Sequence, residues 1–122
     1  MEQPFRLTTE LTGNRLVIAT AGYVNNVGGE AIAREFQRHF AHGVKHVIVN
    51  LALSKVVNSI GMSFLIEIIE TLNDAGGLLI FTNLDPAVEK MLAIMGLFKF
   101  AGKEKSVEDA LHTLEALPPG NR

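Results

Sequence analysis

Hydrophobic and polar residues alternate at the start of the chain, and the pattern becomes more apolar as the chain continues. Phe5, Leu7 and Thr9 are separated by more polar neighbours, as expected for a half-buried strand. Thr12-Gly13-Asn14 is typical of a turn, and an apolar run rich in β-branched residues extends from Leu16 to Ala21. These two runs and the turn between them predict a β-hairpin.

Apolar residues at four-residue spacing follow the hairpin. Ile32, Phe36 and Phe40 share this spacing, which places them on one face of a helix. Asn25-Asn26 precedes them as a candidate N-cap, and Gly43 follows them as a helix stop. We therefore predict the first helix between these two signals.

The second half of the chain alternates between strand and helix patterns. The predicted elements are a buried strand from His46 to Leu51, a helix from Gly61 to Ala75, a strand from Leu78 to Thr82, a helix from the cap Asp85-Pro86 to Gly96, an edge strand from Phe98 to Ala101, and a helix from Ser106 through Leu117. This order predicts an α/β fold, a mixed β-sheet with about four helices packed on it. We expect one domain over 1–122, ordered over about 5–117 and loose outside that range.

Composition narrows the functional class. With 122 residues and 48% hydrophobic content the chain suits one core, and a net charge of −2 gives no attraction to nucleic acid. The absence of cysteine excludes disulfides, thiolate metal sites and cysteine nucleophiles. No basic leader and no apolar run of ~20 residues occurs, so we expect a cytoplasmic protein without membrane insertion.

Motifs for catalysis or metal binding are weak. His39, His42 and His46 cluster in the sequence, and a helix would bring the first two to one face, but no carboxylate completes a ligand set. Histidines near a helix C-terminus are also explained by the helix dipole. Glu67 and Glu70 fit a solvated helix face. We predict no enzyme activity, metal or cofactor.

Ser59 stands directly before an apolar helix. Its structural role would be to cap that helix, which typically contributes ~1 kcal/mol. Its functional role would be to carry a phosphoryl group, because free amides and the positive end of the helix dipole stabilise added negative charge. Phosphorylation would then change binding while the fold persisted.

At these residues the sequence resembles the STAS family, named for sulfate transporters and anti-sigma factor antagonists. The family has Asp-Leu-Ser at the end of a strand and Asp-Ser-x-Gly at the start of a helix. The counterparts here are Asn50-Leu51-Ala52 and Asn58-Ser59-Ile60-Gly61, and an upstream family pattern corresponds to Gly22-Tyr23-Val24-Asn25. The resemblance covers roughly residues 5 to 117 and is strongest for stand-alone bacterial antagonists.

The resemblance implies a partner-switching regulator. The unphosphorylated family member binds an anti-sigma factor, often a serine kinase, and so releases a sigma factor; phosphorylation reverses this, and a phosphatase resets it. Carried onto this chain, the phosphate acceptor would be Ser59. The residues near the partner would be Asn25, Asn58, Ser59, Gly61, Met62 and Ser63.

Three family aspartates are asparagine here, at positions 25, 50 and 58. Asparagine keeps the hydrogen bonds of aspartate but not its charge. A second hypothesis is therefore a scaffold or accessory subunit, in a stress-signalling assembly or beside a membrane transporter, that uses the same surface without phosphorylation. The predicted strand from Phe5 to Thr9 also leaves a homodimer open.

Overall fold

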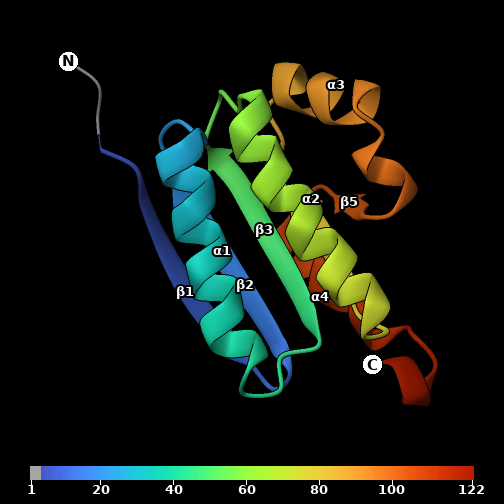
Figure 1. Cartoon of the computed structure of the whole chain (residues 1–122). Coiled ribbons are helices and arrows are strands. Elements are labelled where there is room, and N and C mark those ends of the chain that lie inside the picture. The colour runs from blue at the N-terminus through green and yellow to red at the C-terminus, as the bar shows by residue number, and fades with distance from the viewer. Residues whose placement is uncertain (1–3) are drawn as a thin grey trace.

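The computed structural model describes residues 4–122 and has a five-stranded sheet at its centre (Figure 1). Its strands follow chain order across the sheet: β1 (Arg6–Thr12), β2 (Arg15–Ala21), β3 (His46–Leu53), β4 (Leu78–Thr82) and β5 (Gly102–Glu104). β1 and β2 are antiparallel and all later neighbours are parallel, which confirms the predicted mixed sheet. Residues 1–3, expected to be loose, lie outside the described part.

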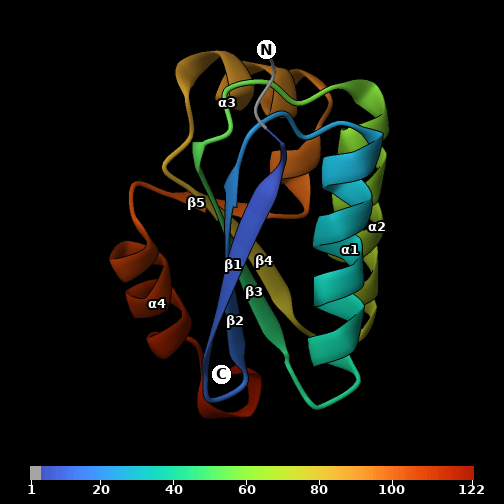
Figure 2. The ribbon, with the colours of Figure 1, turned by 90° about the vertical axis from the view of Figure 1, so that its left-hand side faces the viewer.

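Four α-helices cover the two faces and one end of the sheet. They are α1 (Asn26–Phe40), α2 (Ser59–Asp74), α3 (Pro86–Ile94) and α4 (Val107–Glu115), with short 3₁₀ segments η1 (Leu97–Lys99) and η2 (Pro119–Asn121). Figure 2 shows α1 and α2 on one face and α4 on the other. No helix in residues 4–122 is both long and apolar enough to cross a bilayer.

The core has two layers, one on each face of the sheet. The larger layer packs the apolar stripes of α1 and α2 against the strands, and its fully buried helix residues include Ile32, Phe36, Leu65 and Leu72. The smaller layer packs α4 against the other face and contains Val17, Ile48, Ile80, Ala110 and Leu114. Fully burying one large aliphatic side chain stabilises a fold by roughly 1.5–3 kcal/mol, so the larger layer dominates stability.

The predicted strand from Phe98 to Ala101 is wrong. After Gly96, which adopts a left-handed φ of 82°, the chain forms η1, and the last strand begins later, at Gly102. Phe98 packs edge-on against Phe81 at a ring distance of 6.2 Å. Phe98 therefore packs against the core from a turn, whereas Phe100 is 64% exposed, and β5 is a short segment that pairs with β4 alone.

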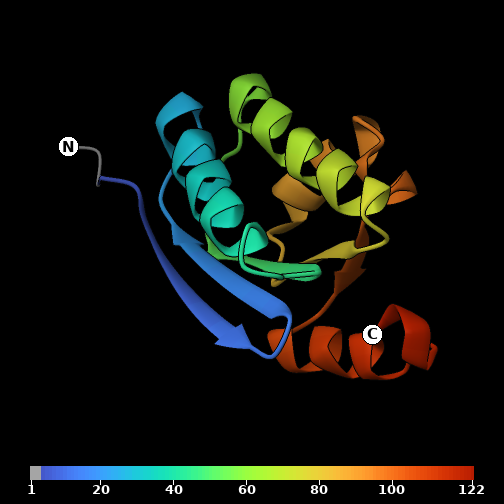
Figure 3. The same ribbon diagram turned by 60° about the horizontal axis from the view of Figure 1, so that its bottom comes forward.

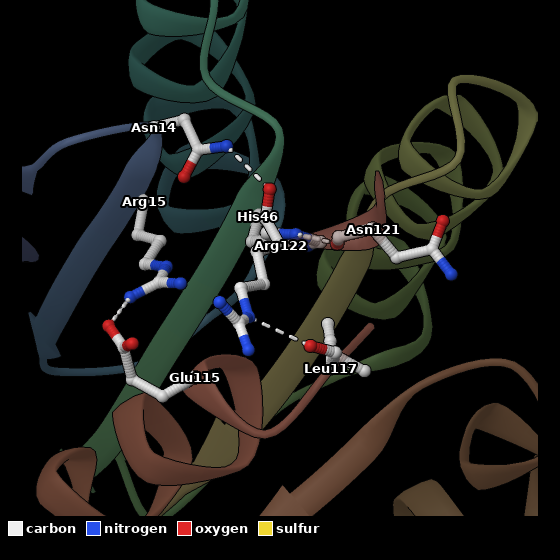
Figure 4. A network of polar contacts seen from close by, with 7 residues as sticks. All are labelled: Asn14, Arg15, His46, Glu115, Leu117, Asn121 and Arg122. Atoms are coloured by element: carbon white, nitrogen blue, oxygen red, sulfur yellow. Dashed lines mark hydrogen bonds and ion pairs between the residues drawn. The ribbon is translucent and has the colours of Figure 1, made fainter. Parts of the chain in front are cut away.

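The chain after Leu117 is folded, contrary to the predicted loose tail. It forms η2, and Figure 4 shows the polar contacts around it, at the end of the sheet where the hairpin turns. Three hydrogen bonds hold its backbone carbonyls, from Asn14 Nδ2 to Arg122 (3.0 Å), from Lys45 Nζ to Gly120 (3.1 Å) and from His46 Nε2 to Asn121 (2.8 Å). Arg15 of β2 also pairs with Glu115 of α4, and this hydrogen bond lowers the pKa of the Glu115 carboxyl.

His46 is buried at the centre of these contacts. The Leu78 amide donates to its Nδ1 at 3.1 Å, so the proton of the neutral ring is on Nε2, where it is donated to Asn121. Burial lowers the pKa of His46 because the charged ring would lose its hydration, although the bond to the Asn121 carbonyl partly opposes this shift. The neutral imidazole therefore links two strands and the tail.

Candidate functional site

The N-termini of α1 and α2 lie side by side where the parallel strands end (Figure 1). Two glycines allow this close approach. A Cβ atom at Gly29 would lie 2.6 Å from Phe64 Cδ2 and 3.1 Å from Gly61 Cα, and one at Gly61 would lie 2.1 Å from the Val24 carbonyl oxygen. The helix starts are therefore packed backbone to backbone, which fixes the position of the residues on them.

Backbone hydrogen bonds join the two segments that lead into these helices. Val24 and Val57 form an isolated parallel bridge. The Val24 amide donates to Val56 O at 3.0 Å, and the Asn58 amide donates to Val24 O at 3.1 Å. The two loops consequently form one rigid frame.

The segment that leaves β3 is anchored at its first turn. The hydroxyls of Ser54 and Thr20 lie 2.7 Å apart in a buried hydrogen bond, and the Gly22 amide donates to Leu53 O at 2.9 Å. These contacts hold the backbone inward, while the Leu53 side chain remains 69% exposed.

Both helices are capped by asparagine. Asn25 Oδ1 accepts from the amides of Val27 (3.0 Å) and Gly28 (3.1 Å), as predicted for the Asn25-Asn26 pair. Asn58 Oδ1 accepts from the Gly61 amide at 2.8 Å, so the N-cap of α2 is Asn58 and the predicted cap at Ser59 is wrong. Asparagine and serine are similarly good caps, and the backbone contact between Asn58 and Val24 decides between them.

Ser59 is therefore the first residue inside α2, exposed and without a capping role. Within residues 4–122 its hydroxyl makes no hydrogen bond, whereas the nearby Ser63 hydroxyl donates to Ile60 O at 2.6 Å. The amides of Ser59 and Ile60 belong to the first helical turn and have no acceptor in that turn. A hydroxyl beside free amides at the positive end of a helix suits an added anion.

Exposed apolar side chains lie on the segments that form the frame around the start of α2, and sequence reasoning missed them. We define the Ser59 surface as the exposed Ser59 together with four apolar residues, Val27, Leu53, Val56 and Ile60. Each of these four apolar residues is more than half exposed to solvent. These residues come from the start of α1, the end of β3, the following loop and the start of α2. A surface of this kind fits an apolar protein partner.

The predicted partner-contact residues differ in their exposure to solvent. Ser63 is exposed, and Asn25 and Asn58 are partly exposed caps, but Met62 is only 2% exposed and packs in the core. Met62 is thus unavailable to a partner, because it lies on the buried face of α2. Gly61 is also buried, and its lack of a side chain allows the Val24 backbone to pack directly against the start of α2.

Charge at the Ser59 surface is low. Within residues 22–29 and 53–63 the only charged side chain is Lys55. Asn50, the third asparagine for which the sequence resemblance implies an aspartate, lies in β3, where its Oδ1 accepts from the Ala52 amide at 3.0 Å. The asparagines therefore serve local hydrogen bonds.

The histidines are held in separate contacts. His42 lies beyond the end of α1, so the predicted shared helix face with His39 is wrong. His42 Nδ1 contacts Arg38 O at 2.9 Å, and His39 lies 3.6 Å from Glu35. No group of three or more histidine, aspartate or glutamate side chains arranged for a metal ion occurs in the part of the chain that the structure describes.

Two concave regions lie away from Ser59. One, of about 450 Å³, is formed by α2 and the segment from Met95 to Phe100. The other, of about 470 Å³, is lined by charged residues that include Glu89, Lys103 and Glu104. Neither region includes Ser59 among its lining residues, so the Ser59 surface is not part of either cleft.

Comparisons with known proteins match this architecture. The STAS domain family model matches residues 6–110. An anti-sigma factor antagonist from Mycobacterium paratuberculosis is 19% identical, with a TM-score of 0.81 over 94% of this chain and 99% of that chain. The anti-sigma factor antagonist SpoIIAA in its unphosphorylated form is also 19% identical, with a TM-score of 0.79 over 93% and 99%. The Bacillus cell fate determinant SpoIIAA in its phosphorylated form is 21% identical, with a TM-score of 0.72 over 88% and 98%.

Proposed function

Because the chain belongs to the STAS domain family, we propose that it is an anti-sigma factor antagonist, a non-enzymatic regulator switched by phosphorylation of Ser59. Its partner is an anti-sigma factor with serine kinase activity, and a phosphatase restores the binding form. The observation that carries the proposal is that Asn58 caps α2, so the exposed Ser59 hydroxyl is not needed as the cap and is available for modification. The likeness to a protein known in unphosphorylated and phosphorylated forms supports it.

The switch works through charge and hydration at the Ser59 surface. Lys55 gives the surrounding loops a charge of +1, and a phosphoserine would add about −1.5 to −2 and reverse the local sign. A partner that packs on Val56 and Ile60 would have to strip water from the phosphate, which is unfavourable without a compensating cation. Asn58 continues to cap α2 in both states, so the fold is unchanged.

Binding by purified variants tests this proposal. We expect the wild type and Ser59→Ala to capture an ATPase-type anti-sigma kinase from host lysate, identified by mass spectrometry, and Ser59→Asp to lose it. The recovered kinase should phosphorylate the wild type but not Ser59→Ala. Gln37→Glu is the control, because it adds one negative charge at an exposed position near the C-terminal end of α1, away from the Ser59 surface. Loss of binding in Gln37→Glu as well as in Ser59→Asp would contradict a switch at Ser59.

The scaffold hypothesis predicts a different result from the same experiment. Its support is the absence of carboxylates at positions 25, 50 and 58. A scaffold would form a complex of fixed stoichiometry that Ser59→Asp leaves intact and that Ile60→Asp, which places charge in the apolar part of the surface, disrupts. Equal capture by the wild type and Ser59→Asp would therefore replace the switch with the scaffold.

A further inference from the structure

β1 is an open edge of the sheet. It pairs only with β2, and no other described strand lies on its outer side. Figure 3 shows that α4 lies on the far side of the sheet from α1, where it packs against Val17, Ile48 and Ile80 of β2, β3 and β4. Consequently Arg6, Thr8, Glu10 and Thr12 are exposed on the face that α4 leaves uncovered.

β1 lacks several of the features that usually prevent an edge strand from pairing with another chain. Natural edge strands are protected by charged side chains, especially lysine, by proline, by a bulge or by very short length. β1 has seven residues without lysine or proline, its register with β2 is unbroken, and its two charged residues, Arg6 and Glu10, have opposite signs. The opposite edge strand, β5, has only three residues. β1 is therefore the edge with both the length and the regularity to pair.

The hairpin turn determines which backbone groups of β1 are free. Gly13, with a φ of 61°, and Asn14 form a two-residue turn between the paired residues Thr12 and Arg15. Such a turn is closed by a hydrogen-bonded pair, and bonded and non-bonded pairs alternate along an antiparallel ladder. The even-numbered residues therefore direct their amides and carbonyls to β2, and Leu7, Thr9 and Leu11 direct theirs outward.

We propose that two copies of this chain form a twofold dimer in which β1 pairs antiparallel with β1 of the second copy, centred on Thr8. In this register Leu7 and Thr9 exchange backbone hydrogen bonds across the axis. Arg6 lies opposite Glu10 of the other copy, and this oppositely charged pair occurs twice. Leu11, 55% exposed in the monomer, lies opposite Phe5.

Charge selects this register from its neighbours. A twofold axis at position 6 would place Arg6 against Arg6, and one at position 10 would place Glu10 against Glu10. A twofold axis at Leu7 or at Thr9 would place both Arg6 and Glu10 opposite uncharged residues of the other copy. Opposite charges across strands stabilise pairing and like charges destabilise it, so only the Thr8 axis uses both charged residues favourably.

Single cysteines test the register directly, since the chain contains none of its own. Thr8→Cys would place two thiols in a non-hydrogen-bonded pair with Cα atoms about 4.5 Å apart, within the range for a disulfide. Thr12→Cys, on the same exposed face, is the control. In this register Thr12 of one copy lies opposite position 4 of the other, so the two Thr12→Cys thiols would be separated by eight residues along the strand, roughly 27 Å. We expect mild oxidation to crosslink Thr8→Cys and not Thr12→Cys; equal crosslinking would overturn the register.

Charge exchange tests the interface independently. Sedimentation velocity should show a wild-type dimer, and Arg6→Glu and Glu10→Arg should each raise its dissociation constant at least tenfold. The double variant Arg6→Glu/Glu10→Arg should restore wild-type affinity, because it exchanges the partners of each pair. In the monomer these side chains lie opposite Ala21 and Val17, and among residues 4–122 neither of them forms an ion pair. A monomeric wild type, or a double variant as weak as the single ones, would overturn the proposal. None of these results depends on Ser59.

Discussion

The two ends of the sheet are built in opposite ways. At the end where the parallel strands finish, a rigid backbone frame carries exposed apolar side chains, of which Leu53 and Ile60 are 69% and 52% exposed. At the other end the polar side chains of Asn14 and His46 hold the backbone of the C-terminal tail (Figure 4), and so does Lys45. One end leaves apolar area uncovered, and the other uses its polar groups internally.

This difference separates a binding end from a stabilising end. Apolar area that remains exposed on a rigid frame is available to a partner at little conformational cost. A buried polar group that is paired, as His46 is, contributes to stability, and removing it leaves its partners unsatisfied. The following predictions test this division, beginning with the largest expected effect.

Gly61→Ala should damage the frame at the binding end. Its Cβ would lie 2.1 Å from the Val24 carbonyl oxygen, so α2 has to move away from α1. We expect the free energy of unfolding to fall by about 3 kcal/mol in urea denaturation. Gly120→Ala is the control, because nothing lies within 4 Å of its added Cβ, and it should change stability by less than about 0.5 kcal/mol. Equal stability of the two variants would show that the helix starts tolerate separation.

His46→Leu should weaken the stabilising end. The substitution leaves the Leu78 amide and the Asn121 carbonyl without their partner. We expect a loss of about 1–3 kcal/mol in the free energy of unfolding, with binding at the Ser59 surface unchanged in the folded protein. His42→Leu, at an exposed histidine, should cost less than about 0.5 kcal/mol. A similar cost for both substitutions would contradict the role assigned to His46.

The stability of the wild type should fall as the pH is lowered from neutrality. The folded-state pKa of His46 lies below its ordinary value of 6.5, so the unfolded chain binds a proton first. The contribution of neutral His46 is complete above pH 6.5 and is lost progressively toward the lowered folded-state pKa. Urea denaturation between pH 7.5 and 5.5 should show this slope in the wild type and a smaller one in His46→Leu. Identical slopes would assign the pH dependence to other groups.

Ser59→Asp should have the smallest effect on stability. Asn58 remains the cap, and a carboxylate in the first turn interacts favourably with the helix dipole. The free energy of unfolding should stay within about 0.5 kcal/mol of the wild type, while binding is lost. Asn58→Ala is the contrasting variant and should cost about 1 kcal/mol through the lost cap. A larger cost for Ser59→Asp than for Asn58→Ala would return the capping role to Ser59.

The fold was predictable where each element carries its own pattern. The strand from Leu78 to Thr82 has the predicted bounds, and Asp85 and Ser106 cap helices as expected. The segment from Phe98 to Ala101 was misassigned because its aromatic residues have strand propensity, while Phe98 packs against Phe81 from a turn. Local pattern does not report a packing partner that is distant in the sequence.

The candidate site was predictable in its location but not in its details. Asn58 and Ser59 are adjacent residues with similar cap propensity, and only the hydrogen bond to Val24 distinguishes them. The exposure of Ile60 and the burial of Met62 depend on the rotation of α2 against the sheet. The order of the tail depends on Asn14, Lys45 and His46, more than 70 positions away.

The strands occupy the sheet in the order in which they are synthesised. Each new strand can join the edge left by the previous one, so no strand has to enter between two that are already paired. α4 follows β5 along the chain, and until α4 is synthesised Val17, Ile48 and Ile80 have no cover on their side of the sheet. From the synthesis of β4 until that of α4, the nascent chain therefore carries an uncovered apolar sheet face that is open to aggregation.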